Sequence, residues 1–366
     1  MINKKVKFLH VFWHNDLKFN PNVVRLIEDK ENQLNPEEHY YLTPYKKVYD
    51  ELIKYTDKVS LVCSDKPHSS KIINKFSKYC DWLIVHSIPN IGKAIFIKKK
   101  NWGKIVWRTW GHDIKYSRKS KGILKNLVKT IIELRWKKMV KSFYGVGIAN
   151  NVDVIALEDF FGKLNTFRLS YSAKDRRNVY ENISLLTTKK TSTLNILIGH
   201  SGNEINEHFK IMDLMKKYRN EDIKLYFILS YGKEEYILKV EKKIKDEWES
   251  KSVIIKEFLP FHAYIELLSN IDVAIFAGNA SHALGNIAAL LQLNKKIFLS
   301  KDGVIAKAFS LDNLNCEFIE EIQDMEFRTF KDSIDNSMIN SSLKPLSYED
   351  GVDCWRDCLG KLSGQI

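Results

Sequence analysis

Short apolar runs alternate with amphipathic stretches along the chain, in two series separated by a polar segment. In the first series the apolar runs span residues 5–13, 39–43, 59–63, 82–86, 104–110, 144–149 and 166–171. In the second they span residues 194–198, 224–229, 253–258, 273–277 and 296–300, with helical patterns over 206–218, 233–248, 261–268 and 282–293. Strands that alternate with helices form parallel sheets with helices on both faces, so the pattern predicts the α/β class.

The two series predict two doubly wound domains with a cleft between them. We assign residues 1–172 to the first domain, 173–192 to a polar linker and 193–345 to the second domain. A final helix is predicted within residues 346–366. A chain of 366 residues is long for a single core, which agrees with this division.

Ligands of open parallel sheets bind beyond the carboxyl ends of the strands, so the turns at those ends are the candidates. In the second domain, the strand at 194–198 runs into the turn Gly199-His200-Ser201-Gly202-Asn203. Glycines let backbone N–H groups approach a ligand, and the start of a helix adds partial positive charge, which suits a phosphate. Many α/β turns carry two glycines and bind nothing, so the spacing alone is weak evidence.

A similar small-residue turn, Gly278-Asn279-Ala280-Ser281-His282, follows the strand at 273–277. Its hydroxyl and N–H groups suit a second phosphate or a ribose, although Ser281 also fits as an ordinary helix cap. Two such turns at equivalent places in one domain favour a nucleotide diphosphate. We therefore predict Gly199, Ser201, Gly202 and Asn203 on one side of the diphosphate, and Ser281 with His282 on the other.

In the first domain, an apolar strand ends in Trp110-Gly111-His112-Asp113. A carboxylate or imidazole at such a place can remove the proton from a sugar hydroxyl, so Asp113 is the predicted general base and His112 a weaker candidate. The alternative is that Asp113 caps the next element. If transfer retains configuration, Asp113 only positions the acceptor. The polar residues predicted to bind the acceptor are His10, Asn15, Asp16 and His86.

Lys and Arg number 58 against 45 Asp and Glu, a net charge of +13, which indicates an anionic partner or simply a lysine-rich genome. Basic and apolar residues are mixed over 93–141, most densely over 118–141. Basic amphipathic helices of this kind lie on anionic membranes, and the alternative is a packed helix with a solvated basic face.

Several other classes lack support in the sequence. The five cysteines form no Cys-x-x-Cys pair and are expected to be reduced thiols in the cytosol. The first residues lack a signal-peptide core, and no apolar run of the length of a membrane span occurs. We find no metal motif and no Walker loop, so no metal or cofactor is expected.

Motifs spread along the chain resemble one known family. They are Leu9-His10-Val11 with Asn22 and Val24-Arg25-Leu26, His86, Trp110-Gly111-x-Asp113, Gly199-x-Ser201-Gly202 with Asn206-Glu207-His208, and Phe261-x-Ala263-Tyr264-x-x-Leu267-Leu268 with Asp272. Together they resemble family 56 glycosyltransferases, the bacterial TDP-4-acetamido-4,6-dideoxygalactose (Fuc4NAc) transferases of enterobacterial common antigen synthesis. The combination of Ser201-Gly202 with Asn206-Glu207-His208 is the most specific piece.

The resemblance implies a GT-B fold of two Rossmann-like domains, with the donor on the C-terminal domain and the acceptor on the N-terminal one. It adds Asn206, Glu207 and His208 to the donor site. It also implies metal-independent transfer from a TDP-sugar to a polyprenyl-diphosphate-linked saccharide, by a peripheral protein on the cytoplasmic face of the inner membrane. His112 and the turn at 278–282 depart from the family pattern, which leaves the sugar less certain than the reaction.

Other functions remain open at this point. A GT-B glycosyltransferase of capsule or O-antigen synthesis with another nucleotide sugar would fit the same features. A basic nucleic-acid-binding protein would need interleaved aromatic residues or a known motif, which we do not find. A sugar-nucleotide epimerase would need several acids in the cleft loops, and these loops are poor in Glu.

Overall fold

The computed structural model describes residues 6–17, 19–62, 69–88, 90–111, 113–114, 123–169, 171, 192–333, 342–343 and 346–364. The chain forms two compact units, residues 1–175 with 346–366 (unit 1) and residues 176–345 (unit 2). The predicted linker at 173–192 lies outside the described residues except for Ser192. Each unit holds one parallel sheet between helices, so the predicted α/β class is confirmed.

Unit 1 has a seven-stranded sheet in the order β3-β2-β1-β4-β5-β6-β7, with every neighbouring pair parallel. Its strands are β1 (Val6–Phe12), β2 (His39–Thr43), β3 (Val59–Leu61), β4 (Cys80–His86), β5 (Ile105–Arg108), β6 (Gly145–Ile148) and β7 (Thr166–Arg168). The described parts of β1, β4, β5 and β6 lie in the middle of the sheet and are almost entirely buried, as their near-continuous apolar sequence predicts.

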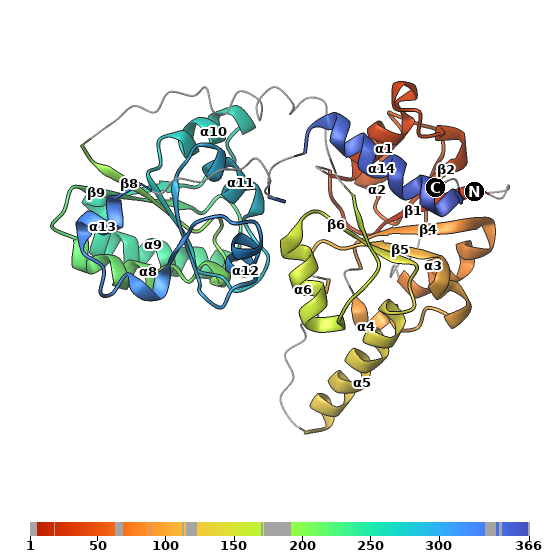
Figure 1. Ribbon diagram of the computed structural model, residues 1–366, viewed down its shortest axis with the longest axis horizontal. Helices are drawn as coiled ribbons and strands as arrows, with labels where there is room; N and C mark the ends of the chain where they lie inside the picture. The colour runs from red at the N-terminus through yellow and green to blue at the C-terminus, as the bar shows by residue number, and fades with distance from the viewer. Residues whose placement is uncertain are drawn as a thin grey trace. The chain divides into compact units, whose positions relative to one another are not determined.

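Helices cover both faces of this sheet (Figure 1). One face packs against α3 (Ser69–Phe76), α4 (Ile91–Ala94), α5 (Ile123–Val140) and α6 (Asn151–Phe161). The other packs against α1 (Asn20–Glu28), α2 (Lys46–Leu52) and α14 (Tyr348–Ser363). The outer turns of α5 project away from the rest of unit 1, and only its last turns reach the core through Trp136, Met139 and Val140.

The last helix, α14, follows unit 2 in the sequence but completes the core of unit 1. It begins with a capping box in which the Ser347 side chain accepts from the N–H of Asp350 and the Asp350 side chain accepts from the N–H of Ser347. Trp355 is fully buried, and its ring lies 5.9 Å from that of His10 on β1. The predicted separate helical segment at 346–366 is therefore part of the N-terminal domain.

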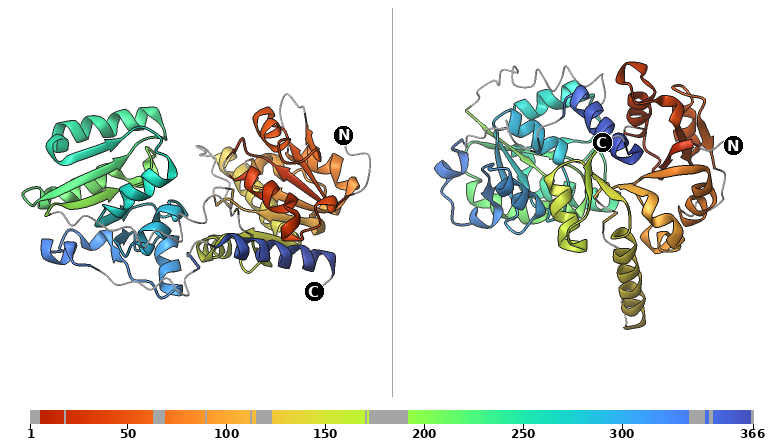
Figure 2. Two further views of the ribbon diagram at one scale, coloured as in Figure 1. Left: turned by 90° about the horizontal axis from the view of Figure 1, so that it is seen from above. Right: turned by 45° about the vertical axis from the view of Figure 1, so that its right-hand side comes forward.

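Unit 2 has a six-stranded parallel sheet in the order β10-β9-β8-β11-β12-β13. Its strands are β8 (Leu194–Ile198), β9 (Ile223–Ile228), β10 (Ser252–Ile255), β11 (Val273–Phe276), β12 (Lys296–Leu299) and β13 (Glu317–Phe318). Its helices are α8 (His208–Met215), α9 (Glu234–Trp248), α10 (Phe261–Ser269), α11 (Leu284–Gln292), α12 (Val304–Leu311) and α13 (Phe327–Lys331), on both sides of the sheet (Figure 2).

Two helices of unit 2 begin later than their sequence patterns predict. α8 begins at His208 instead of residue 206, because Glu207 has left-handed backbone with φ of 47°. α11 begins at Leu284 instead of His282, because Ala283 has φ of 55°. Ser281 and His282 therefore belong to the turn, and the option that Ser281 caps the helix is wrong.

Strand order reverses once in each sheet. In unit 1 the chain proceeds outward from β1 to β3 and then returns to β4 on the other side of β1. In unit 2 it proceeds from β8 to β10 and returns to β11 on the other side of β8. The connections that leave two such strands diverge, which opens a crevice at their carboxyl ends. The edges after β1 and β4, and after β8 and β11, are thus where each unit can hold a ligand.

Candidate functional site

Three buried histidines on neighbouring strands of unit 1 form one hydrogen-bonded chain. His10 on β1 lies between His39 and His86, with its Nε2 2.9 Å from His39 Nδ1 and its Nδ1 3.0 Å from His86 Nε2. The Nε2 of His39 lies 3.1 Å from the carbonyl oxygen of Leu34. All three side chains are at most 1% exposed. They join β2, β1 and β4 through side chains as well as through the backbone.

The chain continues to the edge of the sheet. The Nδ1 of His86 lies 3.0 Å from the Tyr171 hydroxyl, which accepts a hydrogen bond from Trp110 Nε1 at 2.8 Å. An indole N–H only donates and a carbonyl oxygen only accepts, so the two ends set the direction of every bond between them. Each histidine donates from Nε2 and accepts at Nδ1 as a neutral ring.

The acid–base properties of these rings agree with the neutral form. Burial lowers the pKa of His86 to about 3, and that of His39 also to about 3. Burial, reinforced by the two neighbouring histidines, holds the pKa of His10 well below its ordinary value. With both ring nitrogens of His10 and His86 engaged inside the protein, the geometry argues against the direct acceptor contacts predicted for them. Their rings lie inside unit 1, behind the residues at the carboxyl edge of the sheet.

A half-buried aromatic cluster covers that edge. The His14 ring stacks on Trp110, with centroids 4.8 Å apart and planes 8° apart, and its Nε2 lies 3.0 Å from Ser87 Oγ. Phe19 and Tyr171 meet Trp110 edge-on at 5.6 and 5.9 Å. His14 follows β1 and Ser87 follows β4, so the cluster spans the point where the strand order reverses. His14 directly follows the first apolar run, but no role was assigned to it from the sequence.

The carboxylate of Asp113 lies inside the turn that carries Trp110. One oxygen accepts from the N–H of Ile88 at 2.8 Å and from Trp107 Nε1 at 2.9 Å. The other accepts from Thr109 Oγ1 at 2.7 Å and from the N–H of Trp110 at 2.9 Å. The side chain is 1% exposed.

A general base must reach the proton that it removes, and the Asp113 oxygens are turned toward four protein donors instead. This geometry corrects the role predicted for Asp113. Its carboxylate ties the end of β5 to the segment after β4, which is close to the alternative that it caps a local element. His112, the weaker candidate, lies outside the described residues.

The remaining acceptor candidates follow β1. One carboxylate oxygen of Asp16 accepts from the N–H groups of Phe19 and Asn20, the latter at 3.2 Å, so Asp16 caps the start of α1. The side chain is half-buried. Asn15 is exposed at the same edge. The predicted acceptor contacts of Asn15 and Asp16 stay predictions.

In unit 2 the turn after β8 is held by Asn206. Its amide nitrogen donates to the carbonyl of Ser201 at 2.8 Å and to Ser201 Oγ at 3.0 Å, and its amide oxygen accepts from the N–H of His200 at 3.2 Å. Asn206 is fully buried. Asn203 adds a bond from its Nδ2 to Ser201 Oγ at 3.2 Å. Asn206 thus shapes the predicted donor turn from beneath.

Contacts within the protein leave no room for a Cβ at three glycines of these turns. A Cβ at Gly202 would lie 2.1 Å from Ile237 of α9, and one at Gly199, whose φ is +67°, would lie 2.7 Å from Asn206. A Cβ at Gly278 would lie 2.4 Å from the ring of His282. Gly202 is therefore explained by the packing of α9 against the turn. The spacing of the glycines suggested a different reason, the close approach of a phosphate to the backbone.

His200 and His282 bring the two turns of unit 2 together. His200 follows β8, His282 follows β11, and their ring centroids lie 5.2 Å apart. Burial lowers the pKa of His200 to about 4 and also lowers that of His282. Sequence reasoning placed His282 here but missed His200, although it sits between the two glycines of the predicted turn. Ser281 is half-buried beside His282.

The other two family-derived donor residues lie at the start of α8. Glu207 is half-exposed and forms an ion pair with Lys210 at 3.4 Å. His208 is fully buried, its Nδ1 lies 3.2 Å from the Tyr236 hydroxyl, and burial lowers its pKa to about 4. His208 therefore contacts the helix behind the turn.

Two tyrosines that sequence reasoning missed complete this edge. Tyr231, in the connection after β9, is hydrogen-bonded to Ser201, and Tyr264 on α10 is hydrogen-bonded to Asn286 on α11. Burial raises the pKa of both hydroxyls, so they are neutral donors at physiological pH. Tyr264 was quoted for the family pattern alone, since nothing local marks it as part of this edge.

Within the described ranges, no three His, Cys, Asp or Glu side chains are grouped so that they could hold a metal ion. In the same ranges no helix is both long and apolar enough to cross a membrane.

Several solved structures share this fold of two parallel α/β units. The chain is similar to a glycosyltransferase from Rickettsia africae, with 13% identity, 99% of this chain and 98% of that chain covered, and a TM-score of 0.61. It is also similar to HepE of Anabaena in complex with UDP and glucose, with 10% identity, 98% and 99% coverage, and a TM-score of 0.60. WaaG, a glycosyltransferase of lipopolysaccharide biosynthesis, matches at 10% identity over 98% and 100% of the chains, with a TM-score of 0.55.

These similarities define the fold as GT-B, as the sequence resemblance implied. The family itself is given by the sequence, because residues 6–363 match glycosyl transferase group 56, described as 4-alpha-L-fucosyltransferase. The chain belongs to that family and is a glycosyltransferase.

Proposed function

We propose that this glycosyltransferase moves Fuc4NAc, or a closely related deoxy-amino sugar, from a TDP-sugar to a polyprenyl-diphosphate-linked saccharide. The observation that carries the donor half is the meeting of two small-residue turns where the strand order of unit 2 reverses. Crevices at such points are where open α/β sheets bind nucleotides. The description of the family as fucosyltransferases supports a deoxy sugar, and the structure of HepE with UDP supports a nucleotide-sugar donor.

The acceptor half of the proposal rests on the edge of unit 1. Trp110, Phe19 and Tyr171 present aromatic surface there, and His14 lies against it. A hydroxyl acceptor gains reactivity when a nearby group takes its proton. We assign this role to His14, because it is the half-buried imidazole of the cluster and its Nε2 already lies at hydrogen-bond distance from a hydroxyl, that of Ser87. Asp113 would hold the turn in place.

The test is direct transfer by the full chain. Purified protein is incubated with TDP-Fuc4NAc and a polyprenyl-diphosphate-linked disaccharide, and the lipid-linked product is measured by mass spectrometry. UDP-GlcNAc and UDP-glucose serve as rival donors. Product from TDP-Fuc4NAc alone supports the proposal. Product from a rival donor replaces it by the alternative of another nucleotide sugar in capsule or O-antigen synthesis, and no product with any donor overturns it.

Two glycine variants provide a matched pair for this assay. Gly278→Ala forces a Cβ within 2.4 Å of the His282 ring and should displace it, whereas a Cβ at Gly285 on α11 meets no atom within 4 Å. We expect Gly278→Ala to lower turnover at least tenfold and Gly285→Ala to leave it within twofold. Equal activity of the two variants would exclude this turn from the donor site.

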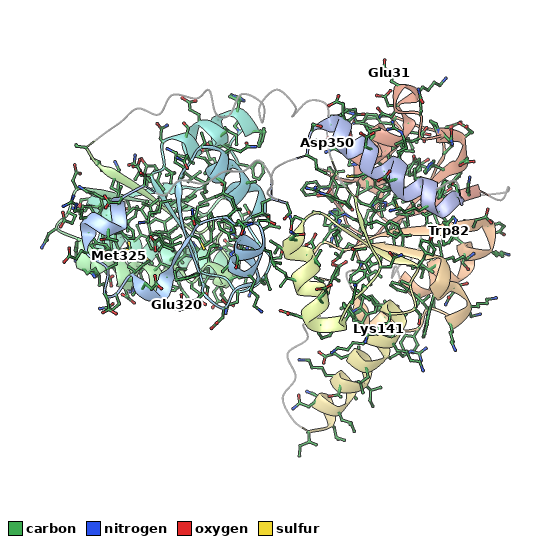
Figure 3. The ribbon with its side chains drawn as sticks, in the orientation of Figure 1. Glu31, Trp82, Lys141, Glu320, Met325 and Asp350 are labelled. Carbon is green, nitrogen blue, oxygen red and sulfur yellow. The ribbon has the colours of Figure 1, made fainter. Side chains whose placement is uncertain are left out.

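We also propose that α5 binds the anionic cytoplasmic face of the membrane that holds the acceptor. Leu124, Leu127, Ile131 and Leu134 follow one stripe of the helix and are 78%, 55%, 55% and 63% exposed. At about 100° per residue Lys125 and Lys129 lie on the far side of the helix from the stripe, and Figure 3 shows the side chains of the outer turns projecting into solvent beyond Lys141. An exposed apolar stripe on a lysine-rich helix is complementary to an anionic lipid surface.

Flotation with vesicles of phosphatidylglycerol and phosphatidylethanolamine tests this surface. Leu124→Ser with Leu127→Ser and Ile131→Ser should abolish binding at every salt concentration. Lys125→Glu with Lys129→Glu should remove the salt-sensitive part, at about 1 kcal/mol per lysine lost. The control is Leu238→Ser, a 60% exposed leucine on α9. Unchanged flotation of both α5 variants would refute the surface.

A further inference from the structure

The two histidines at the edge of unit 2 each have a ring nitrogen that is buried without a partner. These atoms are Nδ1 of His200 and Nε2 of His282, and His208, which contacts α9 behind the turn, also has an unpartnered Nε2. The rings lie 5.2 Å apart, between the turns that follow β8 and β11. Buried polar atoms in native proteins are nearly always hydrogen-bonded, so two orphaned nitrogens on adjacent rings mark a place that a ligand completes.

The protonation of His282 follows from its other nitrogen. Its Nδ1 lies 2.5 Å from the carbonyl oxygen of Ala280, so this nitrogen carries the proton and donates it. In the neutral ring the orphaned Nε2 is then an acceptor only. It repels a phosphate oxygen, which also has only lone pairs to offer. The ring can donate to a phosphate from Nε2 only after it takes up a second proton.

We infer that His200 and His282 bind the diphosphate of the donor, and that His282 takes up one proton from solvent as the diphosphate binds. The inference rests on the proposed donor site. It adds that the site neutralises part of the negative charge of the ligand. No covalent bond changes in this step: the proton passes from water to Nε2, which then donates to a phosphate oxygen. The resulting imidazolium neutralises part of the diphosphate charge in a family for which we expect no metal ion.

Two of the lysines near the pair are already matched with carboxylates. Lys233 is paired with Glu204 at 3.3 Å, and Lys210 with Glu207 at 3.4 Å. The other titratable or charged groups on the elements packed against the two turns are Tyr231, Tyr236, Tyr264, His208, Lys301 and Asp302. Burial raises the pKa of the three tyrosines and lowers that of His208, so these four are neutral.

The pH dependence has a definite sign. In the free protein, burial holds the pKa of His200 at about 4 and lowers that of His282, so both rings are neutral at pH 7. A bound dianion raises the pKa of an adjacent imidazole. Diphosphate affinity is then greatest at low pH and falls as the pH rises through the pKa of the complex. Each proton taken up gives up to a tenfold change in affinity per pH unit.

Calorimetry of TDP and UDP binding to the full chain at pH 7 tests the inference. Repeating the titration in phosphate, HEPES and Tris separates the heat of buffer ionisation, and its slope counts the protons taken up. We expect close to one proton for the parent. His282→Gln keeps a neutral donor near the Nε2 position, so uptake should vanish and affinity should fall about tenfold at pH 6 but less at pH 8. His262→Gln, an exposed histidine on α10, should match the parent.

The outcomes separate this inference from the proposed function. Binding of a nucleoside diphosphate with no proton uptake by the parent overturns the inference and leaves the donor site intact. If neither TDP nor UDP binds, the proposed function of unit 2 is overturned. The parent titration needs no variant, so a failure of His282→Gln to fold does not affect it. Uptake retained by a folded His282→Gln would also overturn the assignment to this residue.

Discussion

The histidines of the two units differ both in burial and in partners: His10, His39 and His86 are fully buried, whereas His200 and His282 are half-buried. In unit 1, His39, His10 and His86 have each ring nitrogen in a hydrogen bond within the protein. In unit 2, His200 and His282 each have a nitrogen that is buried without a partner. Burial lowers the pKa in both groups. A lowered pKa therefore does not identify a ligand site, and what distinguishes His200 and His282 is that two unpartnered nitrogens lie on adjacent rings between two strand-end turns.

The largest expected effect is the loss of stability in acid that the three hydrogen-bonded histidines of unit 1 should cause. The folded-state pKa values of His39 and His86 are depressed to about 3, so the stability that they contribute is fully present above the unfolded pKa of about 6.5 and is lost as the pH falls from there toward 3. With His10, the loss approaches roughly 4 kcal/mol per pH unit once all three rings protonate on unfolding. Urea unfolding at pH 7, 6 and 5, followed by tryptophan fluorescence, measures it. An unfolding midpoint independent of pH over this range would contradict the assignment of three neutral histidines in unit 1.

Removal of the central ring should have the next largest effect. His10→Leu leaves His39 Nδ1 and His86 Nε2 buried without partners, which we expect to cost about 3 kcal/mol of unfolding free energy. The matched change in unit 2 is His282→Gln, which should cost only about 1 kcal/mol, because it loses the Nδ1 bond to the Ala280 carbonyl while its Nε2 has no partner to lose. Denaturant titration of both variants gives the comparison. Equal losses would show that the two groups play the same role.

Asp113→Asn sharpens the comparison at the edge of unit 1. The amide must turn an N–H₂ group toward two of the four donors that now face the carboxylate, so we expect a loss of about 2 kcal/mol in stability together with lower turnover. His14→Gln should instead lower turnover about a hundredfold with an unchanged melting temperature. If Asp113→Asn keeps full stability and loses turnover alone, the carboxylate is the base after all.

Much of the fold was predictable because it depends on local pattern. Alternating apolar and amphipathic segments predicted two parallel α/β units, and most strands lie within two residues of their predicted bounds. β13 was missed because it has two residues, too few for a pattern. The membership of α14 in unit 1 was missed because it depends on packing between Trp355 and strands more than 250 residues earlier, such as β1.

The position of the candidate site was more predictable than the role of its residues. The turns at Gly199 and Gly278 lie at the edge expected from the strand order. The role of Gly202 depends on Ile237, and that of Asp113 depends on donors from Ile88 and Trp107. His39 stands at the start of a strand, where nothing local marks it as the partner of His10. Contacts between distant segments decided each of these roles.

The position of α14 also bears on how the protein is made. Unit 1 begins the chain, yet Trp355, Leu359 and Leu362 of its core follow all of unit 2. At about 5–20 residues per second, synthesis of residues 176–345 takes on the order of ten to thirty seconds. Throughout that time the rings of His10 and His86 lack the cover of Trp355, so the core of unit 1 is incomplete until α14 leaves the ribosome.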